Sequence, residues 1–303
     1  MQVLTKSILS LLVMMLVSTS FAQSDDASSA DDSEQLKIAA LEALMSSPPD
    51  RALPLVTKVL AGDHSDEVKI RALFVLSQID LPEAQTVLLD TARNGSGELK
   101  LEAIRMVGIG GNEEALAGLT AIYASGDGDV KESVLHAYMI ADDSNSVYEI
   151  AANATSEEEF ETAVGILGAM DASEELRKLR DREGVSESLI HAYAMSDDFE
   201  SLQALAIDTS NPERQMQAIQ GLGIVGGDEV NAALLEIYRG SDSADIKEAA
   251  LHGMMVADYD DGVLELFRAS QDAGEKRELL RMLVMMDSDA ALEIIDETLS
   301  GNQ

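Results

Sequence analysis

The amino-acid sequence predicts an all-α protein, a right-handed superhelix of about nine stacked helical hairpins. Apolar residues recur at intervals of three and four positions, which is the period of a helix, and alternation with a period of two is not sustained. The 303 residues include 6 tyrosines, 5 phenylalanines, no tryptophan and 5 prolines, a composition that disfavours an all-β sandwich. A pattern of roughly thirty residues also returns along most of the chain, as in helical repeat proteins.

The first 22 residues predict a signal peptide. Lys6 is the one charged residue before an apolar run over 8–17, and Ser20 and Ala22 are small residues two positions apart, as signal peptidase requires. The apolar run is about half as long as a membrane-spanning helix, so a stable membrane span is not expected. We expect cleavage between Ala22 and Gln23 and a periplasmic or secreted protein.

An acidic, serine-rich segment follows the cleavage site. Residues 23–34 contain five carboxylates among serines and alanines, which predicts a solvated linker. From residue 35 to residue 301 we expect one continuous solenoid of helical hairpins. Its first hairpin, over 35–62, is the weakest in pattern because Pro48 and Pro49 interrupt it.

The ends of the strongest helical stretches define the repeat. After each end comes a second, shorter apolar-periodic stretch, so each unit is a helix, a tight turn and a helix. No single unit buries its apolar stripe alone, and neighbouring units must therefore stack. The ends of the first helices align at Asp80, Gly111, Asp142, Asp171, Asp197, Gly227, Asp258 and Asp287.

Capping signals agree with this division. Asn211 precedes Pro212, which places a capping side chain before a proline at the first helical position. Ser156 and Glu159 have the spacing of a capping box. Glycines stand where second helices are expected to end; they are Gly62, Gly95, Gly126 and Gly240.

A longer period overlies the short one. The segment 108–111 recurs as 223–226, and Leu135-His136 recurs as Leu251-His252, at offsets of about 115–116 residues. This recurrence predicts that a block of four units, residues 63–183, was duplicated as residues 184–301. Two halves that fail to superpose would contradict the prediction.

The starts of several first helices resemble the bacterial HEAT-like repeat. An acidic residue, an apolar residue and a lysine occur together and are followed by a small residue three or four positions later; the triplets are 67–69, 98–100, 129–131 and 245–247. The family pattern has arginine where this chain has lysine, and the basic residue is missing near Phe160, Ser186 and Gln215. The resemblance implies the solenoid fold over about 63–301 and second helices that line its concave side; it implies irregular stacking of the units without the lysine.

Composition excludes several functions. The chain has 21 Lys+Arg against 56 Asp+Glu, a formal charge of −35, which would repel a nucleic-acid backbone. It has no cysteine, so it has neither a disulfide nor a thiolate metal site. Gly-x-Ser-x-Gly, His-Glu-x-x-His and phosphate-loop motifs are absent from the sequence. We expect no enzymatic activity and no cofactor.

Three groups of side chains are candidate cation sites. His136, His191 and His252 share one repeat position in alternate units, which places them too far apart for a common metal. Methionines such as Met254 and Met285 stand where other units have aliphatic core residues, although thioethers also bind copper. Aspartate clusters precede helices and are interpreted as caps, with calcium binding left as the alternative; they are Asp127 and Asp129, Asp142 and Asp143, Asp197 and Asp198, and Asp258, Asp260 and Asp261.

The favoured function is an exported scaffold that binds another protein of the cell envelope through an extended curved surface. The alternative is binding of a divalent or soft cation, calcium at the aspartate-rich joints or copper at the methionine-rich helices. Cationic and aromatic side chains on the second helices form the candidate partner surface, and the aromatic ones act as anchors only if they are exposed. These residues are Arg93, Tyr123, Tyr148, Arg180, Tyr238, Arg239, Phe267 and Arg268.

Overall fold

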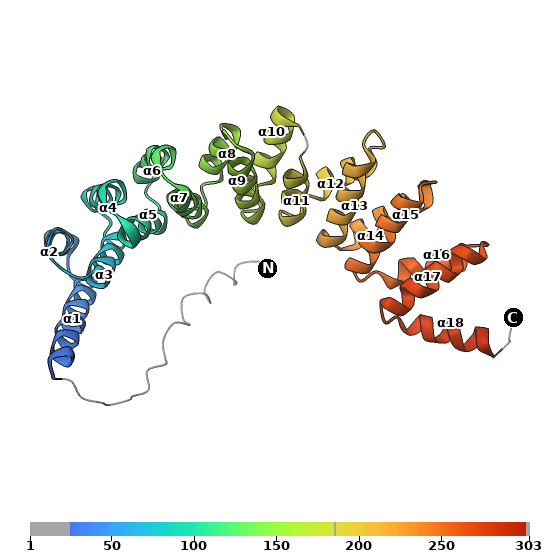
Figure 1. The fold of residues 1–303 in the computed structure, drawn as a ribbon, viewed down its shortest axis with the longest axis horizontal. Coiled ribbons are helices and arrows are strands. Elements are labelled where there is room, and N and C mark those ends of the chain that lie inside the picture. Colours follow the sequence, from blue (N-terminus) through green and yellow to red (C-terminus); the bar gives the residue numbers. More distant parts are fainter. Residues whose placement is uncertain (1–24, 185, 301–303) are drawn as a thin grey trace. The chain divides into compact units, whose positions relative to one another are not determined.

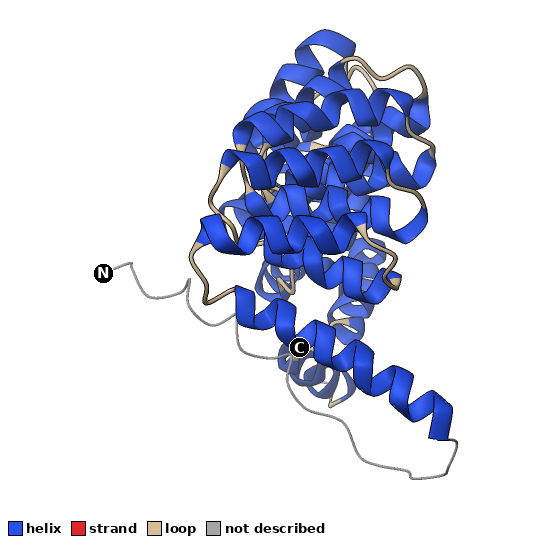
Figure 2. Ribbon diagram, turned by 90° about the vertical axis from the view of Figure 1, so that its left-hand side faces the viewer, coloured by secondary structure: helices blue, strands red, loops and turns tan. Residues whose placement is uncertain are grey.

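The structure is a computed structural model that describes residues 25–184 and 186–300. Every regular element in this part of the chain is a helix (Figures 1 and 2), and the eighteen helices form nine pairs, as predicted. We call the odd-numbered members first helices and the even-numbered members second helices. The predicted signal peptide lies outside the described residues. Among the helices described, none is long and apolar enough to cross a membrane.

The first helices are α1 (Asp25–Leu44), α3 (Asp66–Ser77), α5 (Gly97–Gly110), α7 (Gly128–Ile140), α9 (Glu157–Ala169), α11 (Glu187–Met195), α13 (Pro212–Val225), α15 (Ala244–Val256) and α17 (Ala273–Met285). The second helices are α2 (Pro49–Ala61), α4 (Pro82–Asn94), α6 (Glu113–Ser125), α8 (Ser144–Ala152), α10 (Ser173–Glu183), α12 (Phe199–Ala206), α14 (Asp228–Gly240), α16 (Asp260–Ala269) and α18 (Asp289–Leu299).

The chain divides into two compact units, one ending at Val75 and one beginning at Leu76. In the first unit, α1 begins at Asp25, so residues 25–34 of the segment predicted as a linker are helical. Acidic residues favour the amino end of a helix because they complement its dipole, and alanines favour its continuation. Pro49 occupies the first turn of α2, where its missing N–H costs no hydrogen bond.

The second unit, 76–303, holds the helices from α4 onward (Figure 1). Its core consists of aliphatic side chains at the predicted helical spacing. Leu88, Ile104, Leu119, Leu167 and Leu222 are fully buried, each on a different helix. Burial of such side chains contributes roughly 1.5–3 kcal/mol each. The five residues come from four different pairs, so the core extends along the unit and is not confined to one pair.

The turns inside the pairs explain the repeated aspartates. Each first helix from α5 to α17 is followed by a residue in the left-handed region, a conformation that glycine adopts freely and aspartate tolerates better than most residues. Among the predicted helix ends, Asp80 after α3 does not have a positive φ, and after α13 both the predicted Gly227 and its neighbour Gly226 have one. The aspartates concerned are Asp142, Asp171, Asp197, Asp258 and Asp287, with φ between 50° and 59°.

Caps account for other carboxylates. Asp127, Asp143 and Asp198 each accept a hydrogen bond from the backbone N–H three residues later, at the starts of α7, α8 and α12. The predicted Asn211 cap is confirmed by a bond from Arg214 N. Capping is therefore the right interpretation for one member of each of the first three clusters, whereas Asp142, Asp197 and Asp258 follow the end of the preceding helix instead. In the fourth cluster, Tyr259 stands at the cap position of α16 and no side chain caps the helix, so the capping interpretation is wrong there.

At three places, a glycine allows two successive first helices to approach closely. A Cβ added at Gly108 would lie 2.6 Å from the carbonyl oxygen of Ala137, and one at Gly223 would lie 2.8 Å from the Cα of Gly253. Gly168 faces Ala192 in the same way, at 3.0 Å. These contacts join α5 to α7, α13 to α15 and α9 to α11. The expectation of irregular stacking stays a prediction, because α9 and α13, which lack the lysine, pack closely against the first helix that follows, whereas α9 makes few contacts with α7.

Candidate protein-binding surface

The aromatic residues predicted on the second helices are only partly exposed. Tyr123 on α6 and Tyr238 on α14 are 8% and 5% exposed, so the prediction that they anchor a partner at the surface is wrong. Tyr148 on α8 and Phe267 on α16 are half-buried. A lysine side chain lies over each of these four aromatic rings, with its Nζ 5.0–5.7 Å from the ring centroid.

Polar contacts explain why the two tyrosines are buried. Tyr123 hydrogen-bonds to Glu159 on α9, and Lys131 Nζ lies 3.1 Å from Glu159 Oε1. We call these three residues the Glu159 bridge. Burial and the hydrogen bond to the carboxylate raise the pKa of Tyr123. Hydrogen bonds from the Thr155 backbone, Lys131 and Tyr123 lower the pKa of Glu159 to about 2.

The same arrangement recurs further along the chain. Tyr238 donates to Glu275 Oε1 at 2.9 Å, and Lys247 Nζ lies 3.7 Å from the same oxygen. The offsets between these residues and the Glu159 bridge are 115 and 116 positions, which match the long period of the sequence. Both arrangements lie where neighbouring first helices make few contacts, between α7 and α9 and between α15 and α17. The duplication of a four-unit block stays a prediction that this recurrence supports.

Two of the predicted cationic side chains, Arg93 and Arg239, form ion pairs with carboxylates. The Arg239 guanidinium lies 2.5 Å from Glu265 Oε1. Arg93 is exposed, and its guanidinium lies 3.9 Å from Asp90 Oδ1. Arg268 is exposed and Arg180 is half-buried. A continuous cationic track along the second helices is therefore not formed by these residues, because acidic neighbours share the same face.

Arg177, on α10, holds the most buried of these ion pairs. Its guanidinium contacts both oxygens of Asp198 at 2.8 and 2.5 Å, and the Asp198 side chain has no exposed surface. Burial opposes ionisation of Asp198, but hydrogen bonds from Arg177 and Ser201 hold its pKa below the ordinary value. The pair fastens α10 to the start of α12 and is occupied by structural contacts.

The predicted cation ligands are scattered. His136, His191 and His252 are exposed on separate first helices. Among the described residues, no group of three or more histidines, aspartates or glutamates is placed to hold a metal ion. Met254 is buried as a core residue, but Met285 is 64% exposed, so the core interpretation is wrong for Met285. Binding of a cation remains the alternative function, and calorimetric titration with calcium and with copper tests it.

The first helices carry a surface that the sequence interpretation missed. Two positions before the left-handed residue of each unit stands an exposed residue, and in six of the seven units from α5 to α17 it is a large aliphatic or methionine. Its exposed fraction ranges from 37% to 64%. We call this set the apolar row; it consists of Ile109, Ile140, Met195, Ile224, Val256 and Met285. In α9 the same position holds the small residue Ala169.

Four positions on each first helix form a strip that includes the apolar row. On α7 the strip is Asp129, Glu132, His136 and Ile140, at spacings of three, four and four residues, which place them on one face. On α15 it recurs as 245, 248, 252 and 256, again acidic, acidic, histidine and aliphatic. On these two helices the carboxylates gather at the amino-terminal half of the face and the apolar side chain lies at its carboxyl end. The first three strip positions differ on other first helices: they are Glu98, Leu101 and Arg105 on α5, and Gly274, Arg277 and Arg281 on α17.

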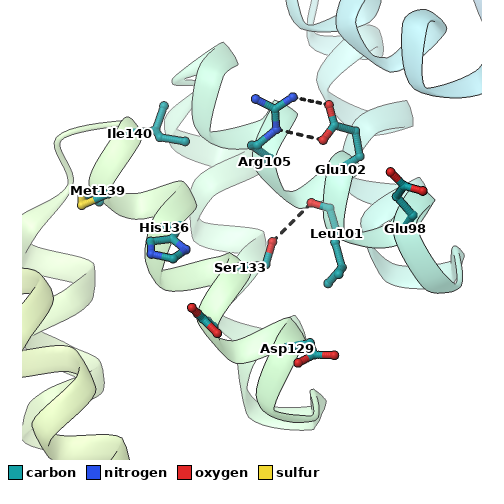
Figure 3. A pocket seen from close by; sticks show the side chains of 10 residues that line it. Glu98, Leu101, Glu102, Arg105, Asp129, Ser133, His136, Met139 and Ile140 are labelled. Carbon is teal, nitrogen blue, oxygen red and sulfur yellow. Dashed lines mark hydrogen bonds and ion pairs between the residues drawn. The ribbon is translucent and has the colours of Figure 1, made fainter. Parts of the chain in front are cut away.

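Between α5 and α7 the strips border a groove of about 510 Å³ (Figure 3). In the groove, Arg105 is paired with Glu102, and Ser133 Oγ donates to the carbonyl oxygen of Leu101 at 3.3 Å. Met139 and Ile140 lie at one end. The sequence signal for this surface is an apolar residue that stands two positions before the Asp or Gly that follows each first helix.

Stacked helical pairs with an exposed, repeated surface define an α-helical repeat protein. The family model for HEAT repeats matches residues 26–99 and 53–139, so this part of the chain is similar to HEAT repeats. The remaining pairs continue the same order of a first helix, a turn and a second helix. No curated protein matches the chain.

Two solved structures resemble the chain distantly. Human deoxyhypusine hydroxylase in complex with glycerol is 15% identical, with a TM-score of 0.33, and the alignment covers 77% of this chain and 99% of that one. The complex of CpcE and CpcF of phycocyanin lyase from Nostoc sp. PCC7120 is 15% identical, with a TM-score of 0.34, and coverage of 79% and 94%. Similarity at this level carries no statement about activity.

Proposed function

We propose that this HEAT-repeat chain is a non-enzymatic scaffold that binds another protein of the cell envelope. The observation that carries the proposal is the apolar row. Single exposed apolar residues are normal on a protein surface, but six at one repeat position, each 37–64% exposed, form a regular array. First helices that pack directly against one another lie about 8–10 Å apart, so the array offers an extended partner a series of apolar contacts at one repeat position. The lack of a known catalytic motif in the sequence agrees with a binding role.

The place of this function is proposed from the first 22 residues. Their charge, apolar run and small residues fit a cleaved export signal, which leads to a periplasmic or secreted protein beginning at Gln23. Intact-mass analysis of the protein from the periplasmic fraction and the medium tests this proposal. A cytoplasmic protein that retains Met1 would contradict it.

Photo-crosslinking in cells tests the scaffold. A photoreactive phenylalanine analogue replaces Ile224 in one variant and Val256 in another, both on the apolar row. The matched control carries the analogue at Glu236, an exposed position on the second helix α14. We expect the same partner protein to be crosslinked from both row positions and not from the control. Equal adducts from all three positions, or none from the row, would contradict the proposal.

A further inference from the structure

The strip on the first helices has a chemistry that selects one kind of partner. We propose that it receives a cationic amphipathic helix, whose apolar side chains cover the apolar row and whose lysines or arginines face the carboxylates. This inference rests on the proposed scaffold function and adds the partner's chemistry.

The acidic part of the strip is available for a partner. In the groove between α5 and α7, Glu98, Asp129 and Glu132 are exposed, and no ion pair holds any of them within the described part of the chain. Glu102, in contrast, is already paired with Arg105. The three unpaired carboxylates line the same groove as Ile140 (Figure 3), so one ligand reaches both.

Distances along the strip match the width of a helix. Glu132 and Ile140 are eight residues apart on α7, about 12 Å at the helical rise of 1.5 Å per residue. A helix with side chains is about 10–12 Å across, so one that crosses the first helices places one flank over the apolar row and the other over the carboxylates. Seven residues of such a helix rise about 10.5 Å, close to the spacing of packed helices, so residues one heptad apart meet successive units.

Charge excludes the other occupants of an apolar surface. A second copy of this chain, with its own charge of −35, would place carboxylates against carboxylates. Anionic lipid surfaces and nucleic acids are repelled by the same groups. A cationic helix instead gains both apolar contact and ion pairs, and its association weakens as salt screens the charges.

A designed peptide supplies the probe. A fluorescent helix of three heptads, roughly 21 residues, carries leucine at the first and fourth heptad positions and lysine on its flanks. One control peptide replaces every lysine by glutamate, and another replaces every leucine by serine. Fluorescence anisotropy with the full-chain protein is expected to show saturable binding of the leucine–lysine helix and at least tenfold weaker binding of both controls.

Protein variants locate the binding. Ile140→Ser is expected to weaken the leucine–lysine helix about tenfold, and the pair Asp129→Asn with Glu132→Gln to weaken it by a similar factor and reduce its salt dependence. Glu236→Gln, on the second-helix face, is the matched control and should leave the affinity unchanged. All four positions are exposed, and circular dichroism with thermal melting verifies that each variant folds.

Each unfavourable result overturns the inference in a recognisable way. Equal binding of the lysine and glutamate helices would mean that carboxylates do not select the partner, while row-specific crosslinks would still support the scaffold. Equal binding of the leucine and serine peptides, or no effect of Ile140→Ser, would mean diffuse attraction to an acidic surface. Self-association through the row, without peptide binding, would make a second copy the occupant.

Discussion

The Glu159 bridge predicts a specific loss of stability in acid. Its surroundings lower the pKa of Glu159 from 4.5 to about 2, and its side chain is only 12% exposed. The full shift corresponds to about 3 kcal/mol, and solvent screening at the partly exposed Lys131 reduces the expected contribution to about 1–2 kcal/mol. Because folding favours the charged carboxylate, this contribution is present at neutral pH and is lost as the pH falls from about 4.5 to about 2.

Glu159→Gln tests the size and the sign of this effect. Urea unfolding followed by circular dichroism at several pH values between 7 and 2 gives the free energy of unfolding of each variant. We expect Glu159→Gln to be about 1–2 kcal/mol less stable than the native protein at pH 7 and to approach it near pH 2. Glu161→Gln, an exposed change on the same helix, is the matched control and should be nearly neutral at pH 7. A native-to-Gln difference that is independent of pH would refute the reasoning.

Three further substitutions test the packing. Gly223→Ala places a Cβ 2.8 Å from the backbone of α15 and should lower the free energy of unfolding by about 1–3 kcal/mol. Gly240→Ala is the control and should leave the free energy of unfolding unchanged, because its added Cβ meets no atom within 4 Å. Equal urea midpoints of the two variants would contradict this prediction. Asp258→Ala should cost about 1 kcal/mol because alanine lacks the local hydrogen bonding that lets aspartate tolerate a φ of 55°, and Asp258→Gly should not; thermal melting distinguishes them. Arg177→Ala should cost about 2 kcal/mol in urea unfolding because it leaves the buried Asp198 without its partner; an unchanged midpoint would exclude a stabilising ion pair.

Most of the fold was predictable because its signals are local. Asp142 and Gly111 end first helices since the left-handed turn is a property of one residue, and Asn211 caps a helix through its own side chain. The helix over residues 25–34 was not predicted because their acidic composition suits a solvated segment and a helix start equally well.

The candidate surface was less predictable because it depends on contacts between helices. The burial of Tyr123 results from Glu159, which lies 36 residues later in the chain, and no local pattern announces that contact. Ile140 and Ile224 continue the apolar period of their helices, so the period alone cannot separate them from the core. Only the position of the neighbouring helices shows that nothing covers them within the described residues.

Methionine footprinting tests the central claim, that the first-helix face receives the partner. Met195 and Met285 belong to the apolar row and are 42% and 64% exposed, while Met45, 47% exposed on the first unit, lies outside it. Mild peroxide oxidation followed by mass spectrometry reports the accessibility of each thioether. With the partner crosslinked at Ile224 added in purified form, the account predicts slower oxidation of Met195 and Met285 and unchanged oxidation of Met45. Unchanged oxidation of both row methionines in the saturated complex would contradict it.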